Sequence, residues 1–146
     1  MKKKGYLLIS AILISISVFA QSPNEATAIE STAVDYLMAW YQGDSELMQA
    51  TIHPHMSKKI VFDTGHKNGA LAYLSAQDLL AQTKRKRTED YNLHDLRKRV
   101  TVLDVYRNTA TVKVETNNWV DYLHLAKVAG QWKIVNILWE LKAEEL

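Results

Sequence analysis

Cysteine is absent from the 146-residue sequence, which excludes disulfide bonds and thiolate metal sites. The same absence excludes a lipid anchor on a cysteine behind an N-terminal apolar segment. Glycine and proline are scarce, at five and two residues, and no glycines have the spacing of a P-loop or a dinucleotide-binding loop. A nucleophilic triad motif is missing as well. Nucleotide-triphosphate chemistry is therefore set aside, and we expect packing alone to stabilise the fold.

The first 20 residues have the pattern of a secretory signal peptide. Three lysines at 2–4 precede an apolar run over 6–19, and short residues lead to a predicted cleavage site between Ala20 and Gln21. The alternative is an uncleaved membrane anchor, but the run is shorter than the roughly 20 residues that a span needs. We expect an exported protein, periplasmic or secreted, with no membrane contact after cleavage.

Charge is nearly balanced in the remaining chain. Residues 1–20 contain three lysines and no acid, which leaves 15 basic and 16 acidic residues over 21–146. Nucleic-acid binding depends on surplus positive charge, so we expect no such partner. The basic runs 84–87 and 97–99 are interpreted as solvated surface. Residues 21–146 have a length that suits one domain with one core.

The N-terminal part has helical periodicity. Apolar residues recur at spacings of three and four over 29–41, which predicts a helix that ends at Gly43. Asp44 is then placed to cap a second, short helix, and Pro54 limits its length.

The middle of the chain is less regular. Residues 60–62 are interpreted as a short strand, 66–69 as a turn and 70–74 as a brief extended piece. Ser75 and Asp78 resemble the capping box of a third helix. Residues 88–95 are polar and are interpreted as a connection.

The last third has the alternation of β-strands. Strands are predicted over 99–106 and 110–115, and a second hairpin over 119–128 and 131–141. Helices followed by such strands predict an α+β fold, with three N-terminal helices packed on one face of a curved antiparallel sheet.

The second hairpin has two largely apolar faces. If Ala129-Gly130 is a two-residue turn, Val128 pairs with Gln131 and fixes the register. One face then carries Trp119, Asp121, Leu123, Leu125, Trp132, Ile134, Asn136 and Leu138. The other carries Val120, Tyr122, His124, Ala126, Val135, Ile137 and Trp139. One layer of helices covers one face, so the second predicts a homodimer, with strong curvature of a single sheet as the alternative.

This hairpin also resembles a known family. The segments Trp119-Val120-Asp121-Tyr122-Leu123-His124-Leu125-Ala126-Lys127 and Gly130-Gln131-Trp132-Lys133-Ile134-Val135-Asn136-Ile137-Leu138-Trp139 are similar to the C-terminal hairpin of the putative lumazine-binding family of nuclear-transport-factor-2-like folds. Residues 41–44 and His53-Pro54 fall where that family has similar segments, and the resemblance covers about residues 26–142. It implies a cone-shaped α+β fold, commonly dimeric, with a pocket between helices and sheet. It implies no particular reaction, because this fold supports many functions.

Five residues form the candidate ligand site. Tyr36 and Trp40 come from the first helix, and Trp119, Asp121 and Asn136 from the hairpin. Aromatic walls suit a flat heterocycle, and the two polar side chains suit its nitrogens and carbonyls. Alternatively, the aromatics belong to the core and Asp121 makes a structural hydrogen bond.

Asp121 is also the candidate catalytic residue. A carboxylate on an apolar face suits a general base, with Tyr36 as the preferred partner. His124 is three residues away on the same strand and points to the opposite face, so the two cannot form a dyad without a bulge.

Metal and cofactor sites are not expected. His53 and His55, at a spacing of two, could share an ion, with His66 eleven residues beyond and Asp63 as the candidate carboxylate, but histidines near a helix end are more often caps or surface residues. The leading hypothesis is an exported, non-enzymatic homodimer that binds a small aromatic or heterocyclic ligand. The alternatives are an acid/base isomerase or dehydratase that uses Asp121, and a ligand-free protein-interaction module.

Overall fold

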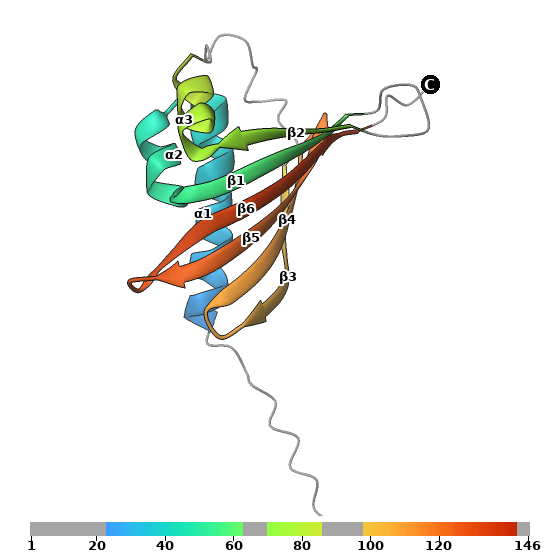
Figure 1. Cartoon of the computed structure of the whole chain (residues 1–146). Helices are drawn as coiled ribbons and strands as arrows, with labels where there is room; N and C mark the ends of the chain where they lie inside the picture. Colours follow the sequence, from blue (N-terminus) through green and yellow to red (C-terminus); the bar gives the residue numbers. More distant parts are fainter. Residues whose placement is uncertain (1–22, 63–69, 86–97, 143–146) are drawn as a thin grey trace, which may run out of the picture.

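A computed structural model describes residues 23–62, 70–85 and 98–142 of the chain. The signal peptide, the 66–69 turn and the 88–95 connection lie outside these residues. Three helices lie on one side of a curved sheet, with α1 along it and α2 and α3 at one end (Figure 1). The expected α+β fold is confirmed.

Helix α1 spans Pro23–Gln42 and packs through the face that the periodicity predicts. Its residues Ile29, Ala33 and Leu37 are at most 1% exposed. The helix ends before Gly43, whose φ of 67° lies in the left-handed region that glycine adopts without strain.

Helix α2 spans Ser45–Thr51, and Asp44 caps it as predicted. The Asp44 carboxylate accepts hydrogen bonds from the backbone N–H groups of Glu46 and Leu47, at 3.1 and 2.9 Å. These bonds satisfy two of the donors that a helix start leaves free.

Helix α3 spans Ala76–Arg85 and follows directly on strand β2, Ala70–Ser75. Its start has the predicted capping box: the Asp78 backbone N–H donates to Ser75 Oγ, and the Ser75 N–H donates to Asp78 Oδ2.

Six strands form one sheet in the order β2-β1-β6-β5-β4-β3. The strands not yet given are β1 Ile52–Phe62, β3 Arg99–Tyr106, β4 Thr109–Glu115, β5 Trp119–Val128 and β6 Gln131–Leu141. Neighbouring strands are antiparallel except for β1 and β6, which run parallel. The sheet is therefore mixed rather than purely antiparallel, because the chain passes through β2, α3, β3, β4 and β5 before β6 returns beside β1.

Strand β1 is much longer than the three residues at 60–62 that the sequence predicts. It begins at Ile52, immediately after α2, and includes Pro54. Its pairing with β6 is irregular between Ile52 and Ser57, so the missing N–H of Pro54 falls where the ladder is interrupted. The proline thus stands inside a strand, three residues after α2 ends at Thr51.

The last hairpin contains a β-bulge that reverses part of the predicted face assignment. Val128 pairs with Gln131 as expected, and Leu125 still pairs with Ile134. The register then shifts, and His124 pairs with Asn136 because Val135 is the extra residue. Beyond the bulge every residue of β6 lies on the face opposite to the prediction.

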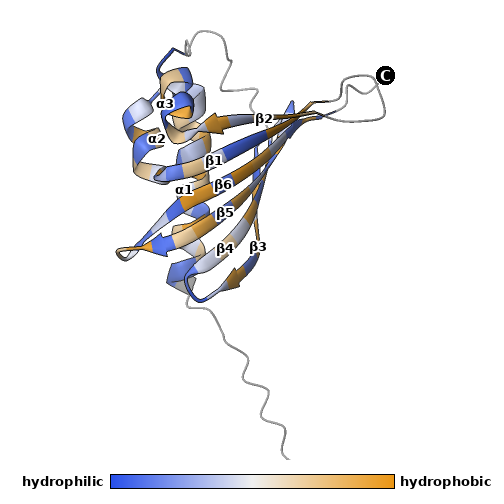
Figure 2. Cartoon of the chain, viewed as in Figure 1, coloured by the Kyte–Doolittle hydropathy of each residue, from blue (hydrophilic) through white to orange (hydrophobic). Residues whose placement is uncertain are grey.

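The two faces of the sheet differ in burial. The inner face, toward the helices, carries Met56 and Lys58 of β1, Asp121 and Leu123 of β5, and Ile137 of β6, all buried. We call the other face the outer face; its central part is formed by Ser57, Lys59, Val61, Val120, Tyr122, His124, Asn136, Leu138 and Glu140. Long apolar stretches run through the central strands β5 and β6 (Figure 2). The hydrophobic core lies between the inner face and the helices.

Candidate functional site

A cavity of about 310 Å³ lies between the helices and the inner face of the sheet. Aromatic and aliphatic side chains make up most of its wall. The lining residues are Tyr36, Leu37 and Trp40 of α1, Leu79 and Gln82 of α3, and Lys58, Ile60, Leu74, Asn118, Trp119, Asp121, Trp139 and Leu141 of the sheet and its β4–β5 turn.

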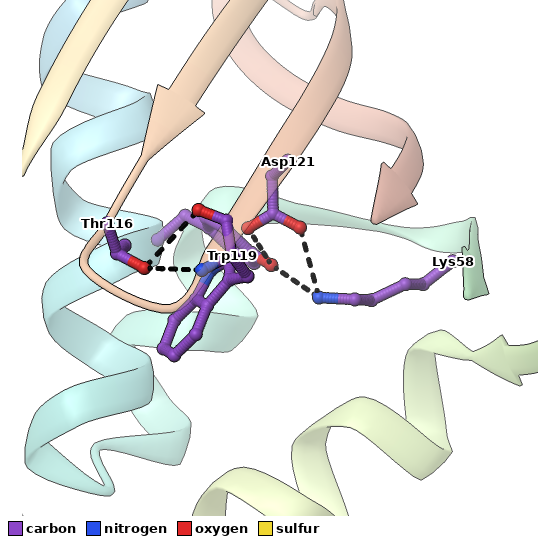
Figure 3. Close-up of polar contacts among 5 residues, drawn as sticks. Lys58, Thr116, Trp119 and Asp121 are labelled. Atoms are coloured by element: carbon purple, nitrogen blue, oxygen red, sulfur yellow. Dashed lines mark hydrogen bonds and ion pairs between the residues drawn. The ribbon is translucent and has the colours of Figure 1, made fainter. Parts of the chain in front are cut away.

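Three polar side chains meet at one side of this cavity, and two of them are labelled in Figure 3. Lys58 Nζ lies 3.3 Å from Asp121 Oδ1 and donates to Tyr36 Oη at 3.0 Å. The Tyr36 hydroxyl in turn donates to Asp121 Oδ2 at 3.3 Å. We refer to Lys58, Asp121 and Tyr36 as the polar triad.

Strands β1 and β5 and helix α1 position the triad, because each directs the side chain concerned toward the inner face. Lys58 alternates with Met56 and Ile60 along β1, so its side chain points to the inner face. Asp121 lies between Trp119 and Leu123 in the same alternation on β5, and Tyr36 comes from the buried stripe of α1.

Burial governs the electrostatics of the triad. Removal from water raises the pKa of Asp121 above its usual range, although Lys58 and the Tyr36 hydroxyl oppose the rise. Burial lowers the pKa of Lys58, with Asp121 opposing. The pKa of Tyr36 is raised well above its ordinary value by burial and then by the negative charge of Asp121. Tyr36 therefore keeps its proton at neutral pH and can donate a hydrogen bond. Because the pKa of Lys58 is lowered and that of Asp121 is raised, the difference between the two pKa values is smaller than in water.

Aromatic rings surround the ammonium group. Lys58 Nζ lies 5.4 Å from the ring centre of Trp139 and 5.7 Å from that of Tyr36, within the range of cation–π attraction. Trp119 stacks on Tyr41 at 5.4 Å between ring centres and lies 6.4 Å from Trp139.

Trp119 also carries a polar atom that is not satisfied. Its indole Nε1 is buried and reaches hydrogen-bond geometry with no group in the described residues, although the indole helps to hold down the pKa of nearby Asp121. The Trp119 backbone is fixed by Thr116, whose Oγ1 accepts from the Trp119 N–H at 3.2 Å (Figure 3). A buried donor without a partner is uncommon in proteins, and this one lies close to Asp121.

Four of the five predicted site residues line the cavity: Tyr36, Trp40, Trp119 and Asp121. The preferred contact between Asp121 and Tyr36 is present. Asn136 does not line the cavity, and its placement on the same face as Asp121 was wrong. The bulge at Val135 turns Asn136 to the outer face, where its Nδ2 lies 3.2 Å from His124 Nδ1.

The same bulge exchanges other residues between the faces. Trp139 and Ile137 were assigned to the face opposite Asp121, but Asp121 pairs directly with Trp139, and Ile137 is fully buried on the inner face. Leu138 moves the other way and is 41% exposed. The exclusion of an Asp121–His124 dyad is confirmed, because Asp121 is buried on the inner face and His124 is exposed on the outer one.

Lys58 is the site residue that the sequence analysis missed. A signal was available in the alternation Met56, Lys58, Ile60, which places a lysine between two apolar residues of one strand face. The interpretation of 60–62 as the whole strand concealed it.

The histidine pair of the metal hypothesis is present without a complete ligand set. The His53 and His55 rings lie 5.5 Å apart, and the His55 backbone N–H donates to His53 Nδ1. Across 23–62, 70–85 and 98–142, no group of three or more metal-ligating side chains comes together. His66 and Asp63 lie outside those ranges. In the same ranges, no helix has the length and apolar character to cross a membrane.

The sequence matches the family described as "Putative lumazine-binding" over residues 24–140. A search of curated proteins gives no match. The solved structures include many of similar fold.

Three of these structures illustrate the likeness. An NTF-2 like protein of unknown function from Silicibacter pomeroyi has a TM-score of 0.67 at 18% identity, over 84% of this chain and 99% of that one. An NTF2-like protein of unknown function from Methylobacillus flagellatus has a TM-score of 0.66 at 22% identity, over 85% of this chain and 97% of that one. A ketosteroid isomerase-like protein from Erwinia carotovora atroseptica has a TM-score of 0.59 at 16% identity, over 83% of this chain and 98% of that one. Identities this low establish a common fold and no activity.

Proposed function

Because this chain belongs to the putative lumazine-binding family and has the nuclear-transport-factor-2-like fold, we propose that it binds a small aromatic or heterocyclic molecule in its cavity, without turnover. The match over residues 24–140 confirms the family that the C-terminal hairpin resembles. The observation that carries the proposal is the polar triad set against the aromatic wall of Trp119 and Trp139.

The cavity has the features of a small-molecule site. A volume of about 310 Å³ is at the lower end of the range for ligand pockets, which favours a compound of one to three rings. Tryptophan faces would stack on such rings. The Trp119 N–H and the Lys58 ammonium would donate to ring carbonyls or nitrogens, and Asp121 would accept from a ring N–H.

Titration calorimetry with lumazine and with flavin-like compounds tests this proposal. We expect at least one of them to bind, and we expect Asp121→Asn to weaken binding about 10- to 150-fold, because one hydrogen bond to a charged group contributes about 1.5–3 kcal/mol. Asn136→Ala is the matched control, because Asn136 lies outside the cavity. The absence of heat with every compound would remove the heterocycle proposal, and a loss of binding in the control alone would place the site elsewhere.

A second candidate function is acid/base catalysis by Asp121. The observation that favours it is the Tyr36 hydroxyl bonded to a buried carboxylate whose pKa burial raises. This candidate predicts that Asp121→Asn abolishes turnover of an enolisable substrate at a temperature where circular dichroism shows the variant still folded. A folded variant that keeps its turnover would assign Asp121 to structure instead.

We also propose that the protein is exported and forms a homodimer through the outer face. Tyr122 and Leu138 are adjacent there and are 42% and 41% exposed, and Leu71 and Tyr73 of β2 continue the apolar surface. A second copy of the same face would cover these side chains. If the cavity bound nothing, this face would support the alternative of a ligand-free interaction module.

A further inference from the structure

The polar triad contains an amine and a carboxylate, although the binding of a neutral ring requires no charged group. Hydrogen bonds to a heterocycle can be made by amides and hydroxyls, whereas Lys58 places a primary amine in the wall of the cavity at 8% exposure. A buried ion pair adds little to stability, because desolvation offsets the Coulomb attraction. Packing alone therefore does not account for the lysine.

The geometry points to a covalent role: we propose that Lys58 Nζ forms a reversible imine with the carbonyl group of an aldehyde or ketone bound in the cavity. The proposal rests on the proposed function, because the same cavity must first hold the compound. Lysine is the side chain that reacts in this way, and burial of its amine is the usual means of activating it.

Each step of the reaction has a donor and an acceptor in the triad. The Lys58 ammonium first gives a proton to Asp121, 3.3 Å away, which leaves a neutral amine and a carboxylic acid. The amine attacks the carbonyl carbon, the C=O bond opens, and the oxygen takes a proton from the acid to give a carbinolamine. The nitrogen then loses its second proton to the carboxylate, and the hydroxyl departs as water with that proton. The product is a protonated imine, which keeps the third proton of the original ammonium and is paired with the Asp121 carboxylate; one water is released, and no oxidant or reductant is consumed.

Tyr36 connects the two charged partners. Its hydroxyl accepts from Lys58 at 3.0 Å and donates to Asp121 at 3.3 Å, so a proton can also pass through it. Burial lowers the pKa of Lys58 and raises that of Asp121, which reduces the free energy needed to form the neutral amine. The rings of Tyr36 and Trp139 beside the ammonium would receive the apolar part of the compound.

Lys59 is an internal control for this chemistry. It is the next residue of the same strand but lies on the outer face, where its Nζ donates to Ser57 Oγ at 3.1 Å and Asn136 Oδ1 at 3.2 Å. It has no carboxylate among these partners and does not line the cavity. Reaction at Lys58 but not at Lys59 would therefore report on the site rather than on lysine in general.

The experiment is reductive trapping on the full chain. The protein is incubated with 2-naphthaldehyde and sodium cyanoborohydride at pH 7, and adducts are counted by intact-protein mass spectrometry and located by peptide mapping. We expect one dominant adduct at Lys58, formed at least about tenfold faster than at Lys59, because only Lys58 lines the cavity that holds the aldehyde beside the amine. Lys58→Arg should abolish it, and Lys59→Arg should leave it unchanged.

Non-covalent binding separates this proposal from the previous one. 2-Naphthalenemethanol has the same rings but no carbonyl, and its binding is followed by quenching of tryptophan fluorescence. Quenching without an adduct at Lys58 would overturn the imine proposal and leave the binding proposal standing. No quenching and no adduct, together with no heat from lumazine and the flavin-like compounds, would overturn both. If Lys58→Arg does not fold, protection of the wild-type chain from trapping by 2-naphthalenemethanol serves instead, and labelling spread evenly over surface lysines would overturn the proposal.

Discussion

Lys58 and Asp121 are buried together, at 8% and 1% exposure, with the ammonium 3.3 Å from the carboxylate. Removing one member leaves the other charged in an apolar surrounding. We expect Asp121→Ala to lower the free energy of unfolding by about 3–5 kcal/mol, the usual cost of breaking a buried pair. Urea denaturation followed by tryptophan fluorescence measures it.

The double variant Lys58→Met/Asp121→Leu is the control for this prediction. It removes both charges and keeps apolar volume, so its stability should lie within about 1–2 kcal/mol of wild type or exceed it. If the double variant were as unstable as Asp121→Ala, the loss would come from packing and not from an unpaired charge. A stable double variant that binds no ligand would show that the pair is kept for function.

At the scale of elements, the start of α2 depends on one side chain. The Asp44 carboxylate accepts from two backbone N–H groups, and the short helix joins α1 to β1. Asp44→Ala should lower the unfolding free energy by about 1 kcal/mol, the typical value for loss of an N-cap. Asp44→Asn keeps the acceptor and should lose much less. Equal losses in the two variants would argue that charge, rather than capping, is what Asp44 supplies.

A second element-scale contact joins the first turn of α1 to the last hairpin. Glu25 accepts from Lys127 Nζ at 2.5 Å and from Trp132 Nε1 at 2.8 Å. These hydrogen bonds, that of Lys127 first, hold the pKa of Glu25 below its ordinary value. A carboxylate with a lowered folded-state pKa stabilises the fold above its unfolded pKa, and the contribution is lost as the pH falls through the folded value.

We therefore expect a pH-dependent difference between wild type and Glu25→Gln. Wild type should melt at the higher temperature near pH 7, and the two curves should converge as the pH falls below the ordinary glutamate range. Thermal unfolding across pH 3 to 7 measures this, with an exposed acid such as Glu46→Gln as the comparison. A difference that persists unchanged at low pH would assign the effect to lost packing.

Prediction from the sequence succeeded where the signals are local. The bounds of β5 and β6 follow from alternation interrupted at Ala129-Gly130, and two helix starts follow from Asp44 and the Ser75–Asp78 box. The bulge at Val135 has no comparable local signal, because it is a feature of how β6 pairs with β5. That single inserted residue moved Asn136 out of the candidate site and Trp139 into it.

The prediction of strand β1 failed for a related reason. Its parallel pairing with β6 joins segments about 80 residues apart, and Pro54 disfavours a strand at its start, so the alternation Met56, Lys58, Ile60 was the one local signal. Because the sequence analysis did not extend this strand to Lys58, its prediction of the polar triad reached only Asp121 and Tyr36. Contacts between distant segments, rather than local propensity, decide which groups share the cavity.

At the scale of the whole molecule, the outer face is the surface that the helices leave uncovered. Across it, Tyr73, Lys59, Leu138, Tyr122 and Lys113 lie in register on neighbouring strands. Beside this row is a groove of about 180 Å³, lined by Val61 and Val120 among others. A face with exposed tyrosine and leucine at its centre suits a partner that also has an apolar centre, such as a second copy of the chain.

Substitution at the centre of this face tests the homodimer. Leu138→Lys would place a charge on both halves of a two-fold interface, so it should convert a dimer to a monomer while the cavity on the inner face stays intact. Sedimentation velocity across a hundredfold range of concentration measures the change, and circular dichroism checks the fold. Leu103→Lys, at 51% exposure on the edge strand β3, is the matched control and should remain dimeric.

If wild type sediments as a monomer at every concentration, the outer face does not bind a second copy. If both lysine variants dissociate, the interface extends to β3, because a lysine outside the interface would leave the dimer intact.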